Sequence, residues 1–236
     1  FTSAEYMAEE NDKNPLGWTK DEVLTDEIIK CLDSTEGPDY VYTISTQGHG
    51  AYPEEQLIDD PEITVTGAAT EAQNNQWEYY CNEIHEMDNF VKELTDALAD
   101  YPEDVILVMY GDHLPTMGLT VEDLKNKYLF QTEYVIWDNF GMEKKKVNLS
   151  AYQMAAEVMD RAGIHEGTIF RYHQARRNTR NYQVDLETLQ YDLLYGEKYA
   201  YKDKELTFER TKMRMGIYDV SLDSMDLISD IDFTYR

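Results

Sequence analysis

The hydrophobic residues of the chain recur at two spacings, which predict alternating helices and strands. Helical spacing predicts helices at 24–32, 77–98 and 150–162. Runs rich in β-branched and aromatic residues predict strands at 40–46, 105–110 and 134–137. The continuous apolar run at 105–110 is typical of a strand covered on both faces, as in a parallel sheet. The order predicts a three-layer α/β/α domain with helices on both faces of a sheet.

Local signals place several element ends. Capping boxes at Thr19–Glu22 and Ser150–Gln153 predict two helix starts, and Gly163 predicts the end of the second of these helices. A short helix is expected near Thr120, and 54–73 is expected to be an irregular acidic excursion. The pattern changes after about residue 203. We therefore expect a main domain at 1–202 and a β-rich extension at 203–236, with short antiparallel strands around 206–222.

Composition and charge narrow the function classes. The chain has 236 residues, 42% of them hydrophobic, so it can bury a sizeable core. Its net charge of −26 repels phosphate backbones and anionic membrane faces, so we expect no nucleic-acid partner. No apolar stretch approaches the roughly 18 residues of a transmembrane helix. Because the chain begins at Phe1 rather than Met, we expect a preceding segment; Cys31 and Cys81 fit either buried thiols or one disulfide.

Candidate chemistry lies where two predicted strands end. Asp112 and His113 follow the strand at 105–110, and His49 lies between glycines after the strand at 40–46. In α/β sheets, ligands bind beyond the carboxyl ends of strands. A carboxylate beside an imidazole suits Mn²⁺, Zn²⁺ or Fe²⁺ better than Ca²⁺. On spacing alone, the pair also fits a loop aspartate beside a hydrogen-bonded histidine, and His49 fits either a substrate contact or a structural role.

The remaining basic residues carry weaker signals. Arg176, Arg177 and Arg180 lie near His173 and could hold an anion, but we expect solvated charges that offset acidic neighbours. Structural roles are expected for His85 and His165, and 144–146 is expected to be a solvated turn. The chain contains no nucleophile elbow, P-loop, dinucleotide fingerprint or zinc-protease motif.

Two motifs and their order resemble the sulfatase-like lipoteichoic acid synthase family of the alkaline phosphatase superfamily. They are Gly48-His49-Gly50-Ala51-Tyr52-Pro53 and the run from Val108 to His113. Further similar pieces follow the same order: Gly17-Trp18 with Asp21-Glu22, 132–139, 149–153 and 189–192. The resemblance covers roughly residues 17–200 and implies that this chain is the C-terminal half of a sulfatase-like catalytic domain.

The resemblance also implies an activity and roles for three residues. Members are membrane-anchored enzymes whose catalytic domain faces outside the cell. They transfer phosphoglycerol or a related head group from a lipid through a covalent intermediate on a metal-bound threonine. By motif, Asp112 and His113 correspond to two ligands of that metal, Mn²⁺ or otherwise Mg²⁺ or Zn²⁺. His49 corresponds to the histidine that contacts the substrate phosphate.

Other parts of the family pattern are expected upstream of Phe1, namely the remaining metal ligand, a glutamate, and the threonine nucleophile. We therefore expect no catalytic nucleophile in this chain, no activity of the chain alone, and weak or absent metal binding, because two ligands rarely suffice. The expected partner is the missing N-terminal half of its own domain. The expected substrate is an anionic lipid head group or a cell-envelope polymer.

The loop after His49 departs from the best-known lipoteichoic acid synthases, which have an aromatic-proline pair directly after the histidine. Here Gly50 and Ala51 intervene before Tyr52 and Pro53. Phosphoglycerol, phosphoethanolamine and sulfate esters therefore all remain open as substrates. A metal-dependent hydrolase and a non-catalytic binding domain of the cell surface are the alternatives.

Overall fold

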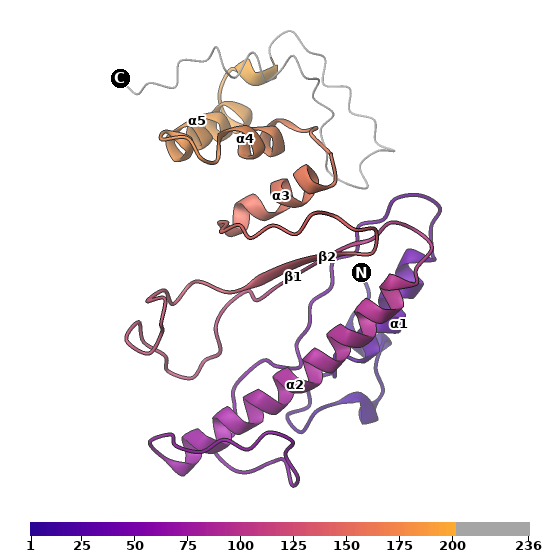
Figure 1. Ribbon diagram of the computed structural model, residues 1–236, viewed down its shortest axis with the longest axis vertical. Coiled ribbons are helices and arrows are strands. Elements are labelled where there is room, and N and C mark those ends of the chain that lie inside the picture. The colour runs from indigo at the N-terminus through magenta and orange to yellow at the C-terminus, as the bar shows by residue number, and fades with distance from the viewer. Residues whose placement is uncertain (202–236) are drawn as a thin grey trace. The chain divides into compact units, whose positions relative to one another are not determined.

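The computed structural model describes residues 1–201 (Figure 1). These residues form parts of two compact units, one from Phe1 to Gly141 and one that begins at Met142, and each unit is described by itself. The expected extension at 203–236, including its short strands, lies outside the described residues. The predicted domain boundary at 202 therefore stays a prediction.

Two helices and a strand pair build the core of the first unit. Helix α1 spans Val23–Leu32 and helix α2 spans Glu71–Ala99, the long magenta helix of Figure 1. The core consists of buried apolar residues, which are Leu24, Phe90, Leu94 and Leu98. Leu107 and Trp137 of the strands pack against them. Two short 3-10 helices precede α1, at Ala4–Tyr6 and Glu10–Asp12.

The sheet of the first unit confirms two predicted strands. Strand β1 spans Ile106–Tyr110 and strand β2 spans Tyr134–Asp138. They pair antiparallel, with Val108 opposite Ile136. Within residues 1–201 the sheet has these two strands, and β1 is only half-buried. The expected parallel pairing with cover on both faces is therefore not seen in this part of the chain.

Two local predictions for the first unit are wrong. Residues 40–46 form no strand, because no segment within 1–201 supplies a ladder partner, and Tyr40, Tyr42 and Ile44 are exposed. No helix begins near Thr120 in the described chain. There the Asp123 carboxylate accepts hydrogen bonds from the Thr120 N–H and Oγ1, each at 2.8 Å, and this closes a single turn.

The capping box predicted at Thr19 is also wrong. Thr19 pairs with Lys13 in an isolated bridge, and the N-cap position of α1 is Glu22. The bridge to Lys13 holds Thr19 in an extended pairing before the helix, and the Asp21 N–H donates to the Gln47 side chain at 2.8 Å. The entry to α1 is thus fixed by a distant residue rather than by its own first turn.

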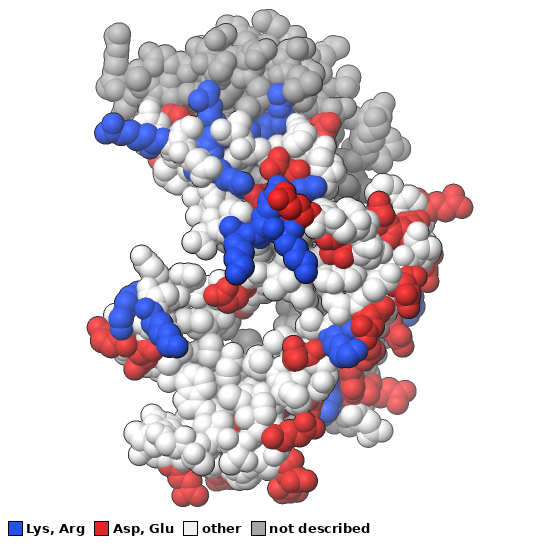
Figure 2. Space-filling view, in the orientation of Figure 1, with Lys and Arg blue, Asp and Glu red and all other residues white. Residues whose placement is uncertain are grey.

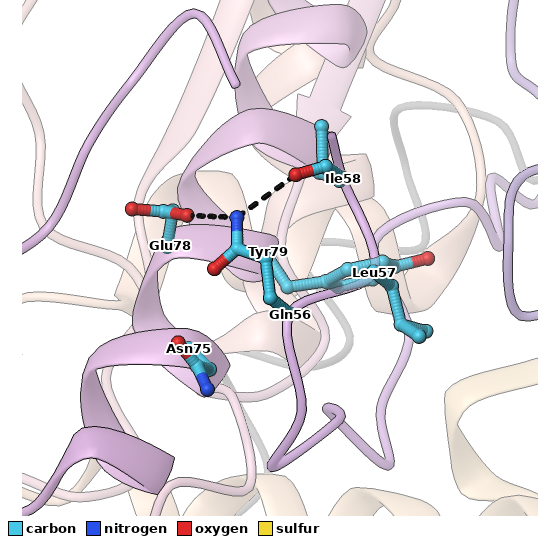
Figure 3. A pocket seen from close by; sticks show the side chains of 6 residues that line it. All are labelled: Gln56, Leu57, Ile58, Asn75, Glu78 and Tyr79. Atoms are coloured by element: carbon cyan, nitrogen blue, oxygen red, sulfur yellow. Dashed lines mark hydrogen bonds between the residues drawn. The ribbon is translucent and has the colours of Figure 1, made fainter. Parts of the chain in front are cut away.

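The acidic excursion after Pro53 is tied to α2 by helix side chains. The Asn82 amide pairs with both backbone groups of Ile63, accepting from its N–H at 3.0 Å and donating to its carbonyl at 2.8 Å. The Glu78 carboxylate accepts from Gln56 Nε2 at 2.6 Å and from the Val65 N–H at 3.0 Å. Figure 3 shows Gln56 between Glu78 and the Ile58 carbonyl. The path of this irregular segment is therefore set by α2.

The second unit is helical over its described residues. A 3-10 turn at Ala151–Gln153 leads into α3 (Met154–Arg161), followed by α4 (Thr168–Arg176), α5 (Tyr182–Leu194) and a 3-10 turn at Tyr199–Tyr201. The capping box of Ser150 and Gln153 is confirmed, and Gly163 follows α3 with a φ of 74°. The buried core residues are Tyr172, Tyr182, Leu186, Leu189 and Ala200.

Candidate functional site

The structure brings together the three residues predicted to form the site. The rings of His49 and His113 lie 6.1 Å apart between centroids and are nearly perpendicular. Asp112 precedes His113 at the end of β1. The loop that carries His49 and the loop after β1 lie close together. A Cβ added at Gly50 would lie only 2.8 Å from Thr116 Oγ1. A side chain at position 50 would therefore require Thr116 or one of the two loops to shift.

The Asp112–His113 pair has a geometry that fits two ligands of one cation. His113 Nδ1–H donates to the Leu114 carbonyl at 2.8 Å, which leaves Nε2 free for a metal, as is usual for metal-binding histidines. This Nε2 lies 3.6 Å from Asp112 Oδ1. Two ligands of a tetrahedral ion at about 2.1 Å lie roughly 3.4 Å apart. Residues 1–201 contain no group of three His, Cys, Asp or Glu side chains that could complete the site.

His49 is oriented in the same way as His113. Its Nδ1–H donates to the Gly50 carbonyl at 2.7 Å, so Nε2 carries the lone pair. The ring of Trp18 lies 5.3 Å from the His49 ring between centroids, edge to face. His49 and His113 are both exposed. The His49 ring thus contacts the rings of both Trp18 and His113, and the carboxylate of Asp112 lies beside His113.

A buried polar network joins the segments around this site. Asp21 accepts a 2.6 Å hydrogen bond from Ser45 Oγ, and Glu83 accepts one from Asn14 Nδ2 at 3.0 Å. Burial raises the pKa of both carboxyls, although their hydrogen bonds oppose the shift. Lys20 pairs with Glu86 at 3.0 Å. This network was missed in the sequence, because its members are far apart along the chain and form no motif.

Of the arginine cluster of the second unit, Arg177 differs from the expectation of solvated charges, whereas Arg180 is exposed as expected. Arg177 bonds to Glu157, whose side chain is only 2% exposed, and Arg161 Nε donates to the same carboxylate at 2.8 Å. His173 is buried, its Nδ1 lies 2.6 Å from the Tyr182 hydroxyl, and burial lowers its pKa. Arg177 and His173 thus stabilise this unit.

The other expectations for single residues have mixed outcomes. His85 pairs with Glu62 at 2.9 Å, and His165 lies 3.1 Å from the Gln174 side chain, as expected of structural residues. Cys31 and Cys81 are unpaired. Cys31 is exposed, which excludes a buried thiol at that position.

A small pocket between α2 and the acidic excursion is a packed contact between the two segments. Its lining residues are Gln56, Leu57, Ile58, Asn75, Glu78 and Tyr79 (Figure 3). The space between them does not admit a water-sized sphere, and Gln56 is hydrogen-bonded across it.

Figure 2 shows acidic side chains spread widely over the visible face, in keeping with the net charge of −26. No helix within residues 1–201 is long and apolar enough to span a bilayer.

Comparison with known proteins identifies the class to which this fold and site belong. The Sulfatase family model matches residues 1–164, so the chain belongs to the sulfatase family and has a sulfatase-like α/β fold. Enzymes of this class generally use a divalent metal.

Two known proteins resemble the chain. The structure of the Streptococcus pyogenes phosphoglycerol transferase GacH in complex with sn-glycerol-1-phosphate matches with a TM-score of 0.63 and 21% identity, over 77% of this chain and 50% of that one. A protein of Rhizobium meliloti (strain 1021), named for cyclic beta-1,2-glucan modification, is 25% identical over 225 residues, 78% of this chain. The chain spans 35% of that relative's length.

Proposed function

We propose that this chain is part of the catalytic domain of a metal-dependent phosphoryl transferase. The enzyme moves phosphoglycerol or a related head group from a lipid to an acceptor of the cell envelope. The observation that carries the proposal is the approach of His49 to the Asp112–His113 pair, with the free Nε2 of His113 3.6 Å from the carboxylate. Membership of the sulfatase family and the fold shared with a phosphoglycerol transferase support it.

Each site residue has a proposed role. Asp112 and the Nε2 of His113 hold the divalent cation, Mn²⁺ or otherwise Mg²⁺ or Zn²⁺. When bound, the cation stabilises negative charge at the phosphate. His49 contacts a phosphate oxygen through Nε2, because its Nδ1–H is held by Gly50. The threonine nucleophile and a glutamate ligand are proposed to lie upstream of Phe1, so the chain alone is inactive and binds metal weakly.

The acceptor and the location are further parts of the proposal. A relative named for glucan modification supports an acceptor hydroxyl on a glycan. Such an acceptor lies in the envelope, so we place the domain on the outer face of the cell membrane. Because Cys31 is exposed, a membrane-impermeant maleimide tests this placement. Labelling of Cys31 in intact cells is expected, and labelling only after lysis would contradict it.

The activity is tested in the full-length protein with glycerol-labelled phosphatidylglycerol and Mn²⁺. Release of diacylglycerol reports cleavage, and label on an added glycan reports transfer. We expect Asp112→Asn, His113→Ala and His49→Ala each to reduce release by at least about 100-fold. His85→Ala, which removes a half-buried histidine paired with Glu62, is the matched control. Release to water alone would favour the hydrolase. No release by the wild type would favour a non-catalytic relative, and an active wild type whose variants are equally active would contradict the proposed roles of these residues.

A further inference from the structure

We infer that Gln47 is a positioning residue for His49, an inference that rests on the proposed role of His49 at the substrate phosphate. Gln47 is only 1% exposed, although it lies two residues before the exposed His49. Its amide side chain and its carbonyl are each held by a different segment of the first unit. The loop that carries His49 is thereby fixed where it begins, at Gln47.

The contacts of Gln47 reach three segments. Its Oε1 accepts from the Asp21 N–H at 2.8 Å, just before α1. Its Nε2 donates to Glu86 Oε2 on α2 at 2.6 Å. Its backbone carbonyl accepts from Asn14 Nδ2 at 3.1 Å. The amide of Gln47 offers a donor and an acceptor together, whereas a glutamate of the same shape would place a carboxylate against Glu86.

The fixed start of the loop orients His49 through a tight turn. The His49 N–H donates to the Thr46 carbonyl at 3.1 Å, so Gln47 and Gly48 are the central residues of a β-turn. The Tyr52 hydroxyl donates to the Gly48 carbonyl at 3.0 Å and holds the turn from the other side. Because both central residues of the turn are hydrogen-bonded to other residues, we infer that the Gln47 contacts orient His49 where it leaves the turn.

Asn14 connects the same anchor to the other neighbour of His49. Its Oδ1 accepts from the backbone N–H groups of Leu16 and Trp18, at 3.1 and 2.9 Å. Its Nδ2 donates to the Gln47 carbonyl and to Glu83. One buried amide therefore fixes both Gln47 and the backbone of Trp18, whose ring lies against His49. The Asn14 side chain thus binds both the turn that leads into His49 and the backbone of Trp18.

The test is a double-mutant cycle on kcat/KM in the full-length protein, with phosphatidylglycerol as substrate. We expect Gln47→Ala to lower kcat/KM on the order of 10-fold, because small displacements of a positioned group are costly. In the His49→Ala background, Gln47→Ala should change kcat/KM by less than about twofold. Asn82→Ala is the matched control, because Asn82 is a buried amide that holds a backbone segment to the same helix. It should lower thermal stability and leave kcat/KM unchanged.

Glu86→Ala gives a second route if Gln47→Ala does not fold. Glu86 is exposed and supplies one of the Gln47 contacts, so the variant should cause a smaller loss of kcat/KM that also disappears without His49. Asp88→Ala, at another exposed position of α2, is its control. An equal loss in both backgrounds would overturn the inference. A His49→Ala variant with normal activity would instead overturn the proposed function.

Discussion

Exchanging Glu157 for glutamine tests the buried ion-pair cluster of the second unit. The Glu157 side chain is 2% exposed and is held by Arg161 and Arg177. Glutamine keeps the shape and one oxygen acceptor but removes the charge. Both guanidinium groups then stay charged without their carboxylate, since arginine does not lose its proton in proteins.

The expected loss follows from the burial of the two arginines. Removing one partner of a buried ion pair costs about 3–5 kcal/mol, because the remaining charge is left uncompensated. The Arg161 side chain is 8% exposed and cannot regain water in place, whereas that of Arg177 is 20% exposed and regains part of its hydration. We therefore expect the free energy of unfolding to fall by about 3 kcal/mol, the lower end of this range.

Urea denaturation followed by far-ultraviolet circular dichroism measures this loss. Glu187→Gln, an exposed carboxylate on α5 of the same unit, is the control and should change the free energy of unfolding by less than about 0.5 kcal/mol. A loss for Glu157→Gln as small as that of the control would refute the claim that the cluster stabilises the unit.

The same pair of proteins gives a pH test with a defined sign. Burial raises the pKa of Glu157, but hydrogen bonds from Arg161 and Arg177 outweigh it and hold the pKa below its ordinary value of 4.5. A carboxyl with a lowered folded-state pKa stabilises the fold fully above its unfolded pKa and loses this effect as the pH falls through the folded pKa. The difference between wild type and Glu157→Gln should therefore shrink on acidification below about pH 4.5. A difference that stays constant into strong acid would show that charge is not its source.

The remaining predictions concern packing, an interelement bridge and thiol reactivity. Leu98→Ala should lower the free energy of unfolding by about 3 kcal/mol in urea denaturation, because Leu98 is 1% exposed in the core of the first unit. Asn139→Ala should cost about 1–3 kcal/mol, since this amide donates to the Leu98 carbonyl at 3.0 Å and accepts from the Val105 N–H at 2.8 Å; a normal melting temperature would contradict it. Ellman's reagent should modify the exposed Cys31 well before Cys81, whose thiol pKa is raised by burial, and equal rates would contradict this order.

Local signals predicted the parts of the fold that depend on neighbouring residues. The helices α2 and α3, the strands β1 and β2 and the Ser150 capping box follow from periodicity and end signals within a few residues. The strand at 40–46 failed because pairing is a property of two segments, and no partner lies within residues 1–201. The Thr19 capping box failed because Thr19 pairs with Lys13 in an isolated bridge, and α1 begins later, with Glu22 at its N-cap.

The candidate site shows the same division. His49, Asp112 and His113 could be found because polar residues beside glycine follow apolar runs. Their approach in space is a finding of the structure, and their chemical roles remain predictions. Asn14 and Gln47 could not be found, because a buried amide has no local pattern and the contacts that join these two side chains to other segments span 26 to 69 residues.

The way α2 holds the acidic excursion has a consequence for how this part of the protein can change. The conformation of residues 54–69 is encoded largely on the helix, where Asn82 and Glu78 bind backbone groups of Ile63 and Val65. Backbone groups are the same in every residue except proline, so side chains of the excursion other than Gln56 and Glu62, which bond to α2, can vary while its path is kept. Grafting this loop into a relative would therefore also require Glu78 and Asn82 at the corresponding positions of the helix, so the loop and α2 would have to be transferred together.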